Sequence, residues 1–128
     1  MPELKKYKMF IDGEWVDSES KKTFETLNPE NNEPWAVAPE ASAKDVDRAV
    51  KAAQKAFEGE WPKLLPRDRA KFLRAIADQL RKNAEMLGKI ETIDTGKLFR
   101  ETKQQAIYIA EYYDCLLYTS PSPRDAES

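Results

Sequence analysis

Residues 65–97 constrain the fold more than any other stretch, because apolar side chains recur through them at helical spacing while charged residues take the other positions. This pattern is typical of a helix with one face packed on a core. Pro66 suits the first helical turn. Asn83 can end one helix or cap the next, so we predict a break there and a second short helix to about Thr92. The apolar positions are Leu73, Ile76, Ala77, Leu80, Ala84 and Leu87.

The tripeptide Asp94-Thr95-Gly96 is expected to stop this helical stretch. Asp and Thr side chains bond to nearby backbone groups, and Gly adopts the positive φ that ends a helix. A last helix is predicted from Phe99 to about Asp114. Its periodic positions are Phe99, Thr102, Ala106, Ile109, Ala110 and Tyr113.

The helical part of the chain is predicted to begin at Ser42. Ser42 and Asp45 have the spacing of a capping box, in which the serine oxygen accepts one backbone N–H and the carboxylate accepts the N–H of the cap residue. Gly59 and Pro62 should end this helix. Its apolar stripe, expected to be buried, contains Val46, Ala49, Val50, Ala53 and Phe57. With the helices described above, four α-helices are predicted.

Short strands are predicted before these helices. Residues 6–11 and 14–16 flank Asp12-Gly13, a strong signal for a tight β-hairpin. Residues 23–27 read as a third strand, which Asn28-Pro29 should stop, and residues 35–38 as a fourth, ending at Pro39. The sequence therefore predicts short strands followed by helices.

Composition excludes several classes of function. With 21 basic and 23 acidic residues the net charge is -2, which gives no reason to expect binding to nucleic acid or to a membrane surface. No apolar run is long enough for a signal core or a bilayer span, so we expect a cytoplasmic protein. One cysteine and no histidine exclude a disulfide framework, a Cys/His zinc site and a Ser-His-Asp arrangement.

Five short motifs occur in a specific order. They are FIDGEWV at residues 10–16, FETLNP at 24–29, PEAS at 39–42, DVDRAV at 45–50 and IDTGK at 93–97. In this order and spacing over residues 8–114, the chain resembles the N-terminus of an NAD(P)-dependent aldehyde dehydrogenase, closest to the betaine aldehyde or general aldehyde branch. Members of that family are several times longer, so the apolar faces would be covered by structure further along the chain.

The resemblance implies an α/β fold of the aldehyde dehydrogenase type and two regions. Residues 1–41 would form strands like the family's oligomerisation arm, through which subunits pair as homo-dimers or tetramers. Residues 42–114 would be the helical N-terminal part of the NAD(P)-binding domain. The intact protein would oxidise an aldehyde to a carboxylic acid with NAD or NADP through a cysteine thiohemiacetal.

The same resemblance implies that this chain holds no catalytic and no cofactor-binding residue. The nucleophile, its glutamate base and the oxyanion-stabilising asparagine of the family lie downstream, and no Gly-x-Gly-x-x-Gly follows a strand here. Cys115 is the only thiol and has no neighbouring base in the sequence, so we expect it to be inert and the chain alone to be inactive.

A cation site is also implied by the resemblance. Many family members hold a monovalent cation such as potassium, and Thr26, Leu27 and Asp94 occupy the matching positions here. Oxygen ligands suit a hard cation. The alternative is that Asp94 only caps the Asp-Thr-Gly turn.

The sequence changes character at Cys115. Two Ser-Pro steps force extended backbone, so residues 115–128 are expected to be disordered. They also resemble a peptide produced when a sequencing adapter is translated in frame, so we expect the natural sequence to end near Asp114. A rival interpretation of the whole chain is a free-standing α+β module that binds a partner through its hairpin and helical faces, without catalysis.

Overall fold

The computed structural model describes residues 4–119, which form two units, residues 4–60 and residues 61–119. All the strands and the first helix lie in the N-terminal unit, and the other helices lie in the C-terminal unit. None of the helices in the described part of the chain is long and apolar enough to cross a membrane.

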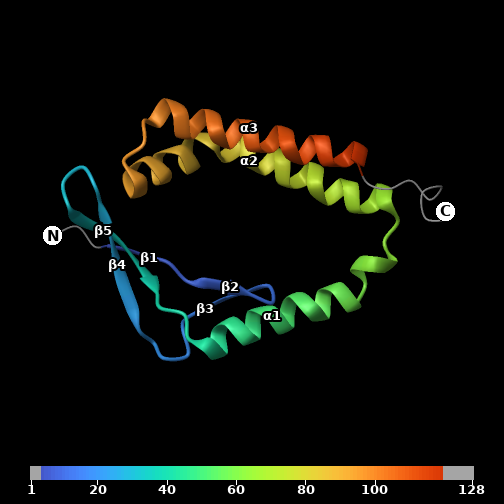
Figure 1. Ribbon diagram of the computed structural model, residues 1–128, viewed down its shortest axis with the longest axis horizontal. Coiled ribbons are helices and arrows are strands. Elements are labelled where there is room, and N and C mark those ends of the chain that lie inside the picture. The colour runs from blue at the N-terminus through green and yellow to red at the C-terminus, as the bar shows by residue number, and fades with distance from the viewer. Residues whose placement is uncertain (1–3, 120–128) are drawn as a thin grey trace. The chain divides into compact units, whose positions relative to one another are not determined.

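Three strands of the N-terminal unit form one sheet (Figure 1). Their order is β1 (Lys5–Lys6), β5 (Glu33–Pro39), β4 (Thr23–Asn28), with β1 parallel and β4 antiparallel to β5. The third and fourth predicted strands are confirmed with longer bounds. The pairing of β1 with β5 was not predicted, because two lysines carry no strand pattern of their own.

The β-hairpin predicted around Asp12-Gly13 is confirmed. β2 (Met9–Ile11) pairs antiparallel with β3 (Glu14–Val16), and the turn residues have φ of 53° at Asp12 and 83° at Gly13. Positive φ at both positions is the requirement of a type I′ turn, which matches the twist of the flanking strands. The first hairpin strand is shorter than the predicted residues 6–11.

Helix α1 (Ala43–Glu58) begins with the predicted capping box at Ser42 and ends before Gly59. Its stripe is amphipathic as expected and is uncovered within the described residues, and its burial by structure further along the chain stays a prediction. Val46, Val50 and Phe57 are 56%, 61% and 68% exposed. Helical periodicity identifies an apolar face and cannot tell which structure covers it.

After a short 3-10 helix, η1 (Trp61–Lys63), helix α2 (Pro66–Thr95) runs without interruption. The predicted break at Asn83 is therefore wrong, and the described residues contain three α-helices, where four were predicted. Asn83 is helical, and its side-chain Nδ2 donates to the carbonyl oxygen of Gln79 at 2.8 Å, one turn earlier.

The stop signal at Gly96 is confirmed, one turn later than the predicted helix end. Gly96 has φ of 74°, and its N–H donates to the carbonyl oxygen of Thr92 at 2.9 Å. This is the left-handed C-cap that glycine favours.

Helix α3 (Phe99–Thr119) extends beyond Asp114, so the predictions of a helix end near Asp114 and of disorder from Cys115 are wrong for residues 115–119. These residues contain no proline and continue the helix, since the first proline that could stop it is Pro121. The prediction for residues 120–128 lies outside the described residues.

Helices α2 and α3 lie side by side and antiparallel (Figure 1). Small residues form their contact, which lets the two backbones approach closely. Thr102 is fully buried, and its hydroxyl donates to the carbonyl oxygen of Gly88 at 2.9 Å. The other buried positions of this seam are Ala77, Ala84, Ala106 and Ala110.

Candidate functional site

Thr26 and Leu27, two of the predicted cation ligands, lie next to each other on β4. The ladder with β5 is irregular between them, since Thr26 pairs with Ala36 and Leu27 with Pro34. The extra residue of this irregularity is Trp35, so the strand that it bends is β5. Thr26 and Leu27, whose carbonyls were predicted to bind a cation, lie opposite this bulge, on the strand without the extra residue.

Asp94, the third predicted ligand, lies exposed in the last turn of α2. Nearby, the Thr95 hydroxyl donates to the carbonyl oxygen of Glu91 at 2.7 Å, and Lys97 Nζ lies 2.7 Å from a Glu91 carboxylate oxygen. The C-terminal end of a helix carries partial negative charge, which favours cations.

The two halves of the predicted cation site belong to different units. Thr26 and Leu27 lie in residues 4–60 and Asp94 lies in residues 61–119, so each half is described separately. Among residues 4–119, no group of three or more His, Cys, Asp or Glu side chains is arranged to hold a metal ion. The cation site stays a prediction.

Cys115 lies on the exposed surface of α3. The preceding residue, Asp114, forms an ion pair with Arg81 of α2. This hydrogen bond raises the pKa of Arg81 above its ordinary value. The neighbouring carboxylate thus pairs with Arg81 and connects the two helices.

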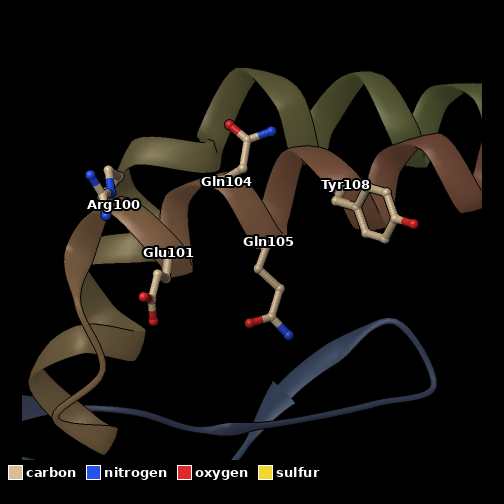
Figure 2. Close-up of a pocket in the computed structure, with 5 residues that line it drawn as sticks. All are labelled: Arg100, Glu101, Gln104, Gln105 and Tyr108. Atoms are coloured by element: carbon tan, nitrogen blue, oxygen red, sulfur yellow. The ribbon is translucent and has the colours of Figure 1, made fainter.

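A hollow on the outer face of α3 is lined by polar side chains and one aromatic ring. Figure 2 shows Glu101 and Gln105 pointing away from α2, with Tyr108 further along the helix. Tyr108 stacks edge-on against Tyr112 with ring centroids 5.1 Å apart, and hydrogen bonding to Tyr108 raises the pKa of Tyr112. The lining contains no nucleophile beside a base. Its remaining members are Arg100 and Gln104.

Both units expose large apolar side chains. In the N-terminal unit the Phe10 and Trp15 rings pack with centroids 5.0 Å apart, yet both are mostly exposed. Exposed apolar residues elsewhere include Phe24, Val46, Val50, Phe57, Phe72, Ile76, Met86, Leu98 and Ile109. Large apolar side chains exposed in this number are typical of faces that other structure covers.

Helices α2 and α3 approach each other closely where Gly88 meets Thr102 and Lys103, and sequence reasoning missed this contact. A Cβ atom added to Gly88 would lie 2.8 Å from the Lys103 Cα and backbone nitrogen. Thr102 was recognised only as a periodic position of its helix. The available signal was a glycine inside a strong helical pattern, which often marks close packing.

Comparison with known proteins agrees with this arrangement of strands and helices. The family model "Aldehyde dehydrogenase family" matches residues 15–123. An aldehyde dehydrogenase from Aspergillus niger is 49% identical over 89 residues, which are 70% of this chain and 18% of that protein. The chain thus spans about a fifth of the length of its relative.

Solved structures share the fold as well. The NAD-dependent aldehyde dehydrogenase from Sinorhizobium meliloti superposes with a TM-score of 0.85 at 32% identity, covering 89% of this chain and 23% of that one. A point mutant of betaine aldehyde dehydrogenase from Staphylococcus aureus, solved with NAD+, superposes with a TM-score of 0.75 at 38% identity. The match covers 81% of this chain and 22% of that one. The match from Trp15 through all three helices, in sequence and in structure, shows that this chain belongs to the aldehyde dehydrogenase family.

Proposed function

We propose that this chain is the N-terminal part of an NAD(P)-dependent aldehyde dehydrogenase that oxidises an aldehyde to a carboxylic acid. The observation that carries the proposal is the family match over residues 15–123. The names of the two solved neighbours, one NAD-dependent and one bound to NAD+, support a nicotinamide cofactor. Within this proposal the strands of residues 4–39 serve subunit pairing in a dimer or tetramer, and the enzyme is cytoplasmic.

In this proposal the chain scaffolds the cofactor domain and does not hold the cofactor. The four glycines of the sequence, Gly13, Gly59, Gly88 and Gly96, are scattered, and none belongs to a glycine-rich turn between a strand and a helix. Gly88 instead serves the packing of α2 against α3. The exposed apolar stripe of α1 is then a face for the remainder of the domain.

The 128-residue chain alone should give no aldehyde-dependent reduction of NAD or NADP, measured as absorbance of the reduced cofactor. It lacks a nucleophile with a base and lacks a phosphate cradle. Turnover that survives purification and disappears in Cys115→Ser would contradict this expectation.

The rival function, a free-standing interaction module, predicts a different reading frame after the matched region. An open reading frame that continues past the matched region into a glycine-rich strand-turn-helix and a cysteine motif supports the enzyme. A stop codon in genomic DNA directly after this region would support the module. Sequencing the genomic locus distinguishes the two.

We further propose that Thr26, Leu27 and Asp94 contribute to a potassium site in the longer protein. The placement of Asp94 at a helix C-terminus, where partial negative charge favours a cation, supports this. Asp94→Ala in a full-length relative carrying this N-terminus should lower the melting temperature more in potassium than in a large organic cation at equal ionic strength. An equal fall of the melting temperature in both salts would show that Asp94 only caps the Asp-Thr-Gly turn.

A further inference from the structure

One buried carboxylate connects two segments that lie far apart in the sequence. Asp45, in the first turn of α1, is only 4% exposed. On one side its Oδ2 accepts hydrogen bonds from the Ser42 backbone nitrogen and from Ser42 Oγ, each at 2.8 Å. The first of these bonds, together with the Asp45 N–H that donates to Ser42 Oγ at 3.3 Å, forms the capping box of α1.

On its other side, the same carboxylate holds the connection between β3 and β4. It accepts from Ser18 Oγ at 3.1 Å and from the Glu19 backbone nitrogen at 3.2 Å. Ser18 is also buried, and its hydroxyl lies 2.6 Å from the carbonyl oxygen of Glu40. Sequence reasoning predicted the cap and missed this second role, since no local pattern links residues 18–19 to residue 45.

A neutral side chain cannot serve both segments. The Ser42 and Glu19 backbone N–H groups can only donate, so each needs an acceptor oxygen. The Ser42 N–H, the Ser42 hydroxyl and the Glu19 N–H all donate to Oδ2, and the Glu19 nitrogen also lies 3.2 Å from Oδ1. A neutral carbonyl oxygen has two lone pairs for these three donors, and the N–H₂ or O–H group beside it would face the Glu19 N–H, so a buried donor is left unsatisfied. Both segments therefore depend on the ionised form.

We propose that the ionised Asp45 carboxylate is a latch that couples the β3–β4 connection to the start of α1, so that neutralising it releases both segments together. This inference does not depend on the proposed function. Hydrogen bonds from Ser42 lower the pKa of Asp45 below its ordinary value, and hydrogen bonds from Glu19 and Ser18 lower it further by a smaller amount. The ionised carboxylate therefore holds both segments above the ordinary aspartate pKa of about 3.9. It is neutralised, and releases them, as the pH falls through the lower pKa that Asp45 has in the folded chain.

Other charged groups near Asp45 have partners of their own. The Glu19 side chain bonds Lys44 Nζ at 2.8 Å on the exposed surface, and Glu40 contributes its backbone oxygen. Asp47, two residues along α1, pairs with Lys51 at 2.6 Å. Asp47 therefore provides a matched control, an exposed carboxylate in the same helical turn.

The test is amide hydrogen exchange of the full chain, followed by NMR. In Asp45→Asn the Glu19 and Ser42 amides should both exchange at least tenfold faster than in the original chain, while Asp47→Asn should change neither. Faster exchange at Ser42 with an unchanged Glu19 amide would show a helix cap alone and would overturn the latch.

Acid titration of the unaltered chain provides a second test that does not depend on the variant folding. Protection of the Glu19 and Ser42 amides, corrected for intrinsic exchange, should fall with one common midpoint below about 3.9. Two separate midpoints, or a Glu19 midpoint near the ordinary glutamate value of about 4.3, would refute the coupling.

Discussion

Replacing Gly88 by alanine tests the close approach of α2 and α3 directly. Added at Gly88, a Cβ would lie 2.8 Å from both the Cα and the backbone nitrogen of Lys103, and 3.1 Å from its Cβ. Two of these three atoms are backbone, so the clash cannot be relieved by turning a side chain. The helices must move apart, which also strains the bond from Thr102 to the Gly88 carbonyl oxygen.

Two effects of opposite sign set the magnitude. Alanine inside a helix is favoured over glycine by about 1 kcal/mol. Forcing an extra methyl group into a packed contact costs up to about 3 kcal/mol. We use this upper value because the clash is with backbone atoms. The net expectation is a destabilisation of about 2 kcal/mol, or a fall in melting temperature of roughly 8 to 16 °C for a unit of this size.

Thermal unfolding followed by far-ultraviolet circular dichroism measures this effect. Lys82→Ala is the control, because Lys82 is exposed on the same helix and its replacement changes helix propensity without touching the seam. Gly88→Ala should melt well below both the original chain and this control. A Gly88→Ala chain as stable as the original, or more stable, would refute the close packing of the two helices.

Two further predictions concern the same unit. Thr102→Val keeps the shape of the buried side chain and removes its bond to the Gly88 carbonyl oxygen. The free energy of unfolding, measured in urea, should fall by about 1 to 2 kcal/mol. An unchanged free energy would show that the bond is unimportant. The hydrogen bond from Lys71 lowers the pKa of Asp68, so this pair should stabilise α2 above about pH 3.9 and lose that contribution as the pH falls through the lower folded value. Asp68→Asn should flatten this acid dependence of the melting temperature, and an unchanged dependence would contradict it.

Local signals in the sequence predicted much of this fold. The Asp12-Gly13 turn, the Ser42 capping box and the Gly96 helix stop each depend on a few adjacent residues, and each is present. Such features can be predicted because their energetics are settled within one turn of chain.

Features that depend on distant contacts could not be predicted in this way. Asn83 is a plausible helix end by its local preference, but α2 continues through it because α3 packs along both halves of the helix at Ala77, Ala84 and Gly88. Tertiary packing outweighed a propensity difference of a few tenths of a kcal/mol. The dual role of Asp45 likewise depends on a residue 27 positions away.

The predicted cation site shows the same limit. Its residues were identified from the family's motifs. Thr26 and Leu27 lie opposite a bulge in β5, and Asp94 lies in the last turn of α2. The distance between Thr26/Leu27 and Asp94 depends on the packing of whole units, which neither periodicity nor capping rules describe.

The most direct test of the proposed role is a chimera that joins residues 15–119 of this chain to the remainder of the Aspergillus niger aldehyde dehydrogenase, replacing its matching segment. If the chain is the N-terminal part of such an enzyme, the exposed faces of α1, α2 and α3 should fit the host. The chimera should then fold and reduce the host's nicotinamide cofactor with an aldehyde at a kcat/KM within about tenfold of the host, a loss of at most about 1.4 kcal/mol. A chimera that fails to fold, or that folds and assembles like the host but gives no aldehyde-dependent reduction, would contradict the proposal.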